Sequence, residues 1–256
     1  MEGLKDKVFI VTGGGSGIGA VTVQRLLAEG ARVTAAGTNP EKLARTREQA
    51  SDAADRLLTV QFDLGDEGSI ASLVTQTTDR FGRLDGVANV AAAVSADLMA
   101  RDRGVDTMDP DVWAEMMRIN VIGTGLMIRE SLPALVASGG GSIVNVSSLA
   151  AWQQDSTFAA YASSKIALHA LTRHTAHTWG RNNIRCNAVA PGVVLTENVR
   201  TGTPPEVLEA LLEKTALPQF GEPGDLASML AFLLSADSGW ITGQILSVDG
   251  GLTMRE

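Results

Sequence analysis

Short apolar runs alternate along this chain with stretches in which apolar residues recur at helical spacing. Glycine, proline or polar residues bound the runs, as expected for the buried strands of a parallel sheet. The alternation predicts an α/β fold, a doubly wound seven-stranded parallel sheet with helices on both faces and right-handed crossovers. The predicted strands lie at residues 8–11, 32–36, 57–62, 86–89, 142–146, 185–189 and 244–248.

A single domain is expected over residues 1–256. The chain carries no repeat, low-complexity tract or linker, and the glycine triplet at 139–141 fits a turn before the fifth strand better than a domain boundary. With 256 residues, 45% of them hydrophobic, the chain can bury a large core.

Composition narrows the classes of partner. The formal net charge of -8 argues against nucleic acid, whose binding requires a basic surface. The opening apolar run at 8–11 is too short for a signal peptide or a membrane span. The only cysteine, Cys186, cannot form an internal disulfide, and we expect it to be buried in a strand. We therefore expect a cytoplasmic protein that binds a small molecule, with neither nucleic acid nor membrane as a partner.

A glycine-rich segment, residues 13–19, follows the first predicted strand and precedes a predicted helix. Glycines allow the backbone to approach a pyrophosphate closely, and the amino terminus of the following helix favours that anion. The strict G-x-G-x-x-G spacing is absent, because Ile18 occupies its third position. The sequence from Thr12 to Gly19 instead reads T-G-x-x-x-G-x-G. A turn that only joins the strand to the helix would also explain these glycines.

Tyr161 and Lys165 carry the strongest chemical signal. They lie four residues apart on a predicted helix, so both address the same small volume, and Ser148 precedes them. A free tyrosine ionises near pH ~10, but a nearby ammonium or an oxidised nicotinamide would favour the phenolate. The pair could then exchange protons near neutral pH. A half-buried aromatic residue and a solvated lysine also occur at this spacing by chance.

Together, T-G-x-x-x-G-x-G, Ser148 and Tyr161-x-x-x-Lys165 resemble the short-chain dehydrogenase/reductase family, over residues 7 to about 252. The resemblance implies a Rossmann-like fold and NAD(P) as the cofactor. It implies a fourth catalytic residue, Asn120. It also implies a homotetramer or dimer in which the helices of Asn120 and Tyr161 pack across an interface.

The same resemblance places the cofactor at the carboxyl ends of the strands, where doubly wound sheets bind their ligands. Val90 and Ala92 depart from the family's N-N-A-G stretch there, whereas Asn89 is kept. Residues 191–196 would close over the nicotinamide. The residues expected to contact the cofactor are Gly13, Ser16, Gly17, Ile18, Gly19, Thr38, Asp63, Leu64, Asn89, Ala91, Tyr161, Lys165, Pro191, Gly192, Val194 and Thr196.

These features predict reversible hydride transfer between a nicotinamide and a secondary alcohol or ketone. Tyr161 would exchange the hydroxyl proton, and Ser148 would donate to the substrate oxygen as charge develops there. Lys165 would lower the pKa of Tyr161 and, by resemblance, hold the nicotinamide ribose. Asn120, again by resemblance, would position a water that links Lys165 to solvent. Taken singly, Ser148 also fits a turn cap, and Asn120 fits an ordinary polar contact in a helix.

Two other functions fit the same fold. The first is a dinucleotide-binding sensor without catalysis, which the intact Ser148, Tyr161 and Lys165 disfavour. The second is an enoyl reductase, in which the resemblance implies a wider spacing of tyrosine and lysine than the four-residue step found here.

The choice between NAD and NADP depends on the end of the second strand. NAD-binding proteins usually place a carboxylate there for the ribose 2′-hydroxyl, but this position holds Gly37. Thr38 and Ser16 occupy places where the family often carries basic residues, and Thr38 could donate to a hydroxyl or to a phosphate. The missing acid favours NADP.

Segments near the predicted site indicate only the chemical class of the substrate. The charged run at 101–106 forms either a lid edge or an exposed elaboration, and its charge favours the latter. An amphipathic helix predicted at 203–214 either lines a pocket or packs in the core. Trp152, Gln153 and Gln154 follow Ser148 closely enough to face the substrate. These features favour a hydrophobic or alicyclic alcohol.

The three histidines, His169, His174 and His177, fall on or near the predicted helix of Tyr161. No acidic or cysteine ligand accompanies the pair at i, i+3, so we expect no metal site. Surface or interface positions are expected for all three.

Overall fold

The structure, a computed structural model, describes residues 1–153 and 157–254, so Gln154 lies outside the described residues. Its parallel strands form one sheet in the order β3-β2-β1-β4-β5-β6-β7, and each strand begins and ends within two residues of its predicted bounds. The predicted fold is confirmed. The strands are β1 Val8–Thr12, β2 Arg32–Gly37, β3 Leu57–Gln61, β4 Gly86–Asn89, β5 Gly141–Val146, β6 Ile184–Pro191 and β7 Ile245–Val248.

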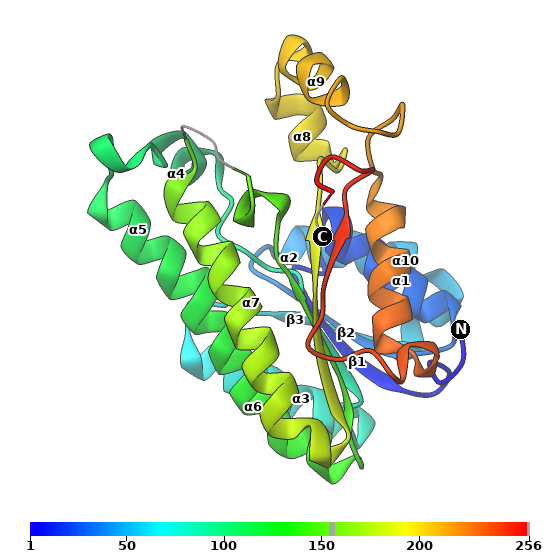
Figure 1. Ribbon diagram of the computed structural model, residues 1–256. Helices are drawn as coiled ribbons and strands as arrows, with labels where there is room; N and C mark the ends of the chain where they lie inside the picture. Colours follow the sequence, from blue (N-terminus) through cyan, green and yellow to red (C-terminus); the bar gives the residue numbers. More distant parts are fainter. Residues whose placement is uncertain (154–156, 255–256) are drawn as a thin grey trace.

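Helices cover both faces of the sheet (Figure 1). Each layer turns an apolar stripe toward the strands, whose residues are buried on both faces, as in β1. The first layer contains α1 Gly17–Ala28, α2 Pro40–Gln49 and α10 Pro223–Leu234, and the second contains α3 Glu67–Phe81, α6 Thr124–Ala137 and α7 Ala159–Trp179.

The helical stretch Pro110–Ala137 comprises α5 Pro110–Met116, a π-helix Met117–Gly123 and α6. By length and composition alone it is long and apolar enough to cross a membrane. Met127, Ile128 and Leu135, however, are buried in the core beneath the sheet. The stretch therefore fits the core helix of a folded domain.

Shorter elements surround the carboxyl ends of the strands. In Figure 1, α8 and α9 stand above these ends on one side, and α4 lies on the other. Within α9 no residue is buried, so the apolar stripe expected at 203–214 does not pack in the core. These elements are α4 Ala96–Arg101, α8 Glu197–Gly202, α9 Pro205–Leu212 and the 3-10 helices Ser51–Arg56, Val105–Thr107, Leu149–Ala151, Gly180–Asn182 and Ala236–Ser238.

The order of the strands reverses at β1, which pairs with β2 on one side and with β4 on the other. Loops leaving β1 and β4 consequently run to opposite faces of the sheet and leave a crevice at their carboxyl ends. Thr12 aligns with Asn89, and Asn89 aligns with Asn145, so polar side chains meet at this edge.

Candidate active site

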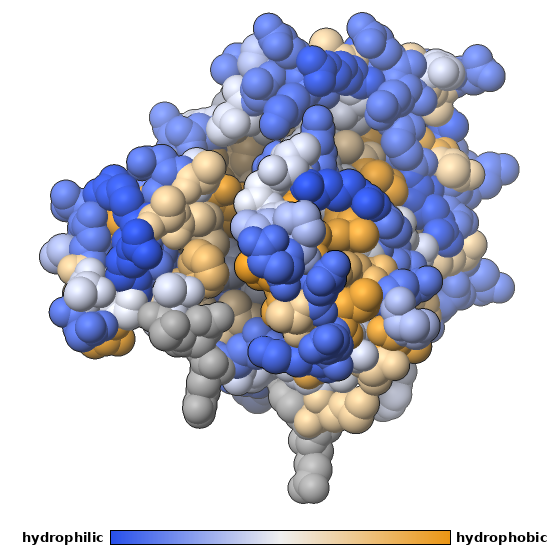
Figure 2. Space-filling view, turned by 90° about the horizontal axis from the view of Figure 1, so that it is seen from above, coloured by the Kyte–Doolittle hydropathy of each residue, from blue (hydrophilic) through white to orange (hydrophobic). Residues whose placement is uncertain are grey.

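A pocket of about 410 Å³ opens at the carboxyl ends of β1 to β4. Its volume falls within the usual range for small-molecule and cofactor sites. Figure 2 looks onto this edge and shows a hollow bordered by both polar and apolar residues.

The backbone conformation of residues 13–19, which border this pocket, requires glycine at several positions. Gly13 and Gly17 have φ angles of 71° and 51°, in the left-handed region that favours glycine. A Cβ on Gly19 would lie 2.1 Å from the carbonyl oxygen of Gly13, too close for any side chain. A Cβ on Gly17 would lie 3.2 Å from Thr196, so the segment after β6 closes over the glycine turn.

The amino terminus of α1 offers free donors to the pocket. Ser16 occupies the N-cap position, yet its side chain makes no capping bond to any described residue. The first turn carries no acidic residue either. The N–H groups and the positive end of the helix are therefore available to an anion such as a pyrophosphate.

A polar floor beneath the pocket also fits a dinucleotide. The N–H groups of Val90 and Ala91 donate to Thr12 Oγ1 at 3.0 and 3.1 Å. Asn89 Nδ2 donates to Asn145 Oδ1 at 2.8 Å, whereas the buried Asn89 Oδ1 has no partner among the described residues. With the glycine turn and the free helix terminus, this orphaned oxygen makes the residues present suitable for NAD(P).

The pocket brings together most of the residues expected to contact the cofactor. Six expected residues do not line it, namely Asn89, Tyr161, Lys165, Pro191, Gly192 and Val194. The expected residues that line it are Gly13, Ser16, Gly17, Ile18, Gly19, Thr38, Asp63, Leu64, Ala91 and Thr196.

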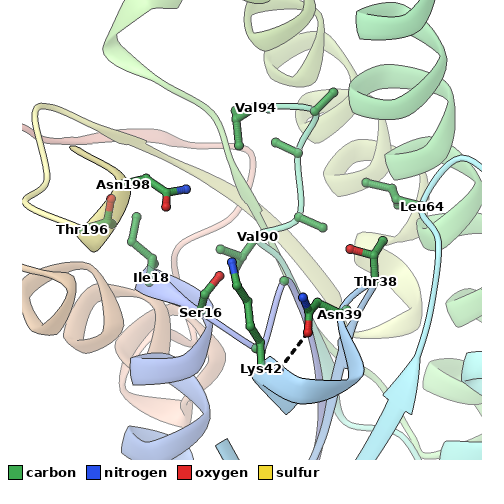
Figure 3. Close-up of a pocket in the computed structure, with 18 of the residues that line it drawn as sticks. Ser16, Ile18, Thr38, Asn39, Lys42, Leu64, Val90, Val94, Thr196 and Asn198 are labelled. Atoms are coloured by element: carbon green, nitrogen blue, oxygen red, sulfur yellow. Dashed lines mark hydrogen bonds between the residues drawn. The ribbon is translucent and has the colours of Figure 1, made fainter. Parts of the chain in front are cut away.

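Lys42 is a pocket residue that the sequence analysis missed. Its side chain extends from the first turn of α2 into the pocket, near Ser16 and Asn39 (Figure 3). Asn39 caps α2 by accepting the N–H of Lys42 at 3.0 Å, which fixes the start of the helix. Helical side chains lean toward the amino terminus, so a lysine in the turn after Gly37 could have been expected here.

Tyr161, Ser148 and Lys165 meet beyond the end of β5. Ser148 accepts the N–H of Ala150 at 3.1 Å, so it caps a short helix, and it also hydrogen-bonds to the Tyr161 phenol. Lys165 is buried, its Nζ donates to the carbonyl of Val146 at 2.9 Å, and the same atom lies 5.6 Å from the centre of the Tyr161 ring. The helical spacing thus places the ammonium beside the phenol.

Burial sets the protonation of this group in the absence of cofactor. It raises the pKa of Tyr161, which the hydrogen bond to Ser148 lowers in part. It also lowers the pKa of Lys165 to about 8, so the ammonium persists at neutral pH. Lys165 was expected to lower the pKa of Tyr161, but in the free protein burial raises that pKa and only the hydrogen bond to Ser148 opposes it.

Asn120 lies in the π-helix and is buried. Its Oδ1 accepts the N–H of Ala93 at 2.7 Å, and its Nδ2 donates to Ser164 Oγ at 2.9 Å. Ser164 in turn donates to the carbonyl of Tyr161 at 2.7 Å. Asn120 therefore links the loop after β4 to the backbone of α7. π-helical turns recur at functional sites.

Two charged or titratable residues differ from expectation. Asp102, in the run expected to be exposed, is only 2% exposed because its carboxylate accepts two N–H groups of α7. His169, expected at a surface, is buried and shares a 2.8 Å hydrogen bond with Ser147 Oγ.

Cys186 is buried as predicted. Among the described residues, no group of three His, Cys, Asp or Glu side chains is placed to hold a metal.

Known proteins resemble this chain along its whole length. The family model described as enoyl-(acyl carrier protein) reductase matches residues 13–253. A 7alpha-hydroxysteroid dehydrogenase from Bacteroides fragilis is 35% identical over 255 residues, which cover 100% of this chain and 97% of that protein. A cis-4-hydroxycyclohexanecarboxylate dehydrogenase from Sinomonas cyclohexanicum is 33% identical over 252 residues, 98% of each chain.

A solved structure shows a similar level of sequence identity and closely matches the fold. A short-chain type dehydrogenase/reductase from Mycobacterium ulcerans superposes with a TM-score of 0.90 and 32% identity, over 97% of this chain and 90% of that one. With the glycine turn, the seven-stranded sheet and the Ser148–Tyr161–Lys165 group, these matches identify the chain as a member of the short-chain dehydrogenase/reductase family.

Proposed function

We propose that this protein is an NAD(P)-dependent oxidoreductase that interconverts a secondary alcohol and a ketone. The observation that carries the proposal is the position of Tyr161, hydrogen-bonded to Ser148 and beside the buried Lys165 ammonium, next to a pocket suited to a dinucleotide. Such an arrangement joins a proton donor to a hydride carrier.

The protein's own part is to hold the substrate oxygen and to move one proton. A nicotinamide, when bound, supplies or accepts the hydride. In reduction, Tyr161 donates its hydroxyl proton to the ketone oxygen, and in oxidation its phenolate takes that proton back. Ser148 donates a second hydrogen bond to the same oxygen. Because this oxygen becomes more negative in the transition state than in the ketone, both donors favour the reaction.

Lys165 keeps a positive charge beside the phenol at neutral pH, since its pKa remains at about 8. The ammonium stabilises the phenolate each time the proton leaves Tyr161. We also assign Lys165 to the nicotinamide ribose, as the family resemblance implies, and the hydrogen bonds from Asn120 through Ser164 support the helix that carries it.

We propose a hydrophobic or alicyclic substrate. The apolar side chains of Val90, Val94 and Ile119 line the pocket, and Val94 is 47% exposed. The relatives described above are named for a hydroxysteroid and for a hydroxycyclohexanecarboxylate. Both names denote ring systems that carry a hydroxyl group, which supports the same substrate class here.

The test is a reductase assay with cyclohexanone derivatives and steroid ketones, beside an enoyl thioester. We expect turnover of a cyclic ketone, and Tyr161→Phe should lower kcat/KM by about 1,000-fold, as expected for loss of a general acid. The affinity for NADPH should not change. Turnover of the thioester alone would favour an enoyl reductase, and cofactor binding without any turnover would favour a sensor.

We further propose NADP as the preferred cofactor. Gly37 leaves no carboxylate at the end of β2 to repel a 2′-phosphate, and the Lys42 side chain enters the pocket near Ser16 and Asn39. Titration with NADPH and with NADH, followed by nicotinamide fluorescence, tests this preference. Tighter binding of NADH would overturn it.

We also propose that the protein forms a homo-oligomer, either a dimer or a tetramer. The side chains of Ile122, Val136 and Ile166 are between 39% and 56% exposed on the π-helix, α6 and α7. A mostly apolar hollow on α6 and α7 is lined by Arg129, Leu132, Pro133, Val136 and Trp179. Light scattering after gel filtration measures the assembly, and a monomer would contradict it.

A further inference from the structure

The first turn of α7 carries the Tyr161 phenol but lacks a cap of its own. Phe158 occupies the N-cap position with φ 59°, in the left-handed region that a bulky residue rarely adopts. Its side chain makes no capping bond to any residue that the structure describes. The opening N–H groups of a buried helix must find acceptors elsewhere, because an unpaired donor there is costly.

Asp102, distant in sequence, supplies these acceptors. Its carboxylate accepts the N–H groups of Ala160 at 3.0 Å and of Tyr161 at 2.8 Å. Its backbone carbonyl accepts the N–H of Phe158 at 3.2 Å, which holds the left-handed residue in place. Bonds to a carboxylate are stronger than neutral ones, and a negative charge is favoured at the amino terminus of a helix.

The backbone of Tyr161 is thus held on both sides. Asp102 accepts its N–H, and Ser164, held by Asn120, donates to its carbonyl. Tyr161 packs against a small buried apolar cluster that includes Val112, Met116 and Ala160. The charged group facing the ring on its own helix is Lys165, and the polar partner from the turn after β5 is Ser148.

We propose that Asp102 is a positioning residue for the reaction: by binding the N–H groups of Ala160 and Tyr161, it fixes the first turn of α7 and hence the phenol opposite Ser148. The inference rests on the proposed function, in which Tyr161 moves the proton. Proton transfer requires accurate geometry between donor and acceptor, so a small displacement of this turn lowers the rate without disturbing the glycine turn that binds the cofactor.

Tyr161 is the only tyrosine in the chain, so ultraviolet difference absorbance after rapid pH jumps reports its ionisation directly. Burial raises its pKa in the intact protein. In Asp102→Ala two N–H groups lose their acceptor, the turn loosens and water reaches the phenol. We expect the tyrosine to titrate closer to the ordinary value of 10 and kcat to fall at least tenfold. The Kd for NADPH should stay within twofold.

Asp102→Asn retains one acceptor oxygen and should give effects between those of the wild type and Asp102→Ala. Asp106→Asn, an exposed neighbour in the same segment, is the matched control and should leave the tyrosine titration, kcat and Kd unchanged. The two Asp102 variants and this control together separate positioning from a general effect of removing negative charge.

A folded Asp102→Ala protein with the wild-type tyrosine titration and kcat would overturn the proposal. Failure of both Asp102 variants to fold would assign the residue to stability alone and would also reject a positioning role. If the wild type reduces none of the ketones, the proposed function fails, but the titration still decides whether Asp102 holds the phenol.

Discussion

The glycine turn and the tyrosine helix are both needed for the proposed reaction, yet they are built in opposite ways. The turn is a contiguous segment, residues 13–19, whose shape follows from positive φ angles and a contact between Gly13 and Gly19. The first turn of α7 instead depends on Asp102 and, through Ser164, on Asn120, which come from other parts of the chain. A local motif fixes the first, and tertiary hydrogen bonds fix the second.

This difference predicts how each region fails. A change in the turn should act on cofactor affinity and leave the phenol alone, because the hydrogen bonds of the turn run to Ala36 and Thr46 and not to α7. A change near α7 should act on the ionisation and rate of Tyr161, while the cofactor still binds.

The largest effect is expected for Gly19→Ala. Its new Cβ would lie 2.1 Å from the carbonyl oxygen of Gly13, so the turn must move. Overpacking costs about 1 to 3 kcal/mol. If the turn leaves its binding geometry to relieve this clash and must be restored on binding, NADPH affinity falls by up to about 100-fold. Titration of nicotinamide fluorescence measures the affinity of the variant for NADPH.

Gly180→Ala is the control for Gly19→Ala, because nothing lies within 4 Å of a Cβ built there. That variant should bind NADPH like the wild type. The tyrosine titration should not change in either variant. If Gly19→Ala altered the ionisation of Tyr161 as strongly as the affinity, the two regions would not be independent.

The second effect concerns the buried charge beside the phenol. Burial lowers the pKa of Lys165 from 10.5 to about 8. Between these values the unfolded state binds more protons than the folded state, so stability rises with pH. The contribution of Lys165 ionisation to the free energy of unfolding is complete above pH 10.5. It is lost as the pH falls through 8, and the free energy of unfolding then changes by about 3 kcal/mol at most.

Urea unfolding of the wild type and of Lys165→Met, between pH 7 and pH 10.5, measures this change as the difference between the two proteins. As the pH rises, the free energy of unfolding of the wild type should increase relative to that of the variant. Cys186, whose pKa burial raises to about 12, contributes the opposite slope, but it does so in both proteins. Lys5→Met, at an exposed lysine, should give a constant difference from the wild type. A constant difference for Lys165→Met would contradict the prediction.

The same contrast explains what the sequence could predict. The strands and the glycine turn were predictable, because apolar runs and contiguous glycines act on their own neighbours. Tyr161 and Lys165 were also predictable as a pair, since helical spacing alone brings them together. Asp102 was not, because its burial depends on Ala160 and Tyr161, which are 58 and 59 residues away. Its charged neighbours indicated the opposite.

The smallest effect is expected for Lys42→Ala. Lys42 contributes to cofactor choice through one ammonium at the rim of the pocket, beside solvent, where a charge interaction is worth roughly 1 kcal/mol. We expect the affinity for NADPH to fall by about fivefold to tenfold and the affinity for NADH to stay the same, because only NADPH carries a 2′-phosphate. Fluorescence titration of both cofactors at low and at high salt measures the ratio.

Lys5→Ala is the matched control, since it removes the same charge from the opposite, amino-terminal end of β1. It should leave the ratio of the two affinities unchanged. High salt should shrink the effect of Lys42→Ala, because mobile ions screen a charge that is only half-buried. An equal loss for NADH and NADPH would mean that Lys42 acts instead by packing near the glycine turn, since a Cβ on Gly15 would lie 3.1 Å from Lys42 Cβ. The choice of cofactor would then belong to the local turn and not to a charge brought in by α2.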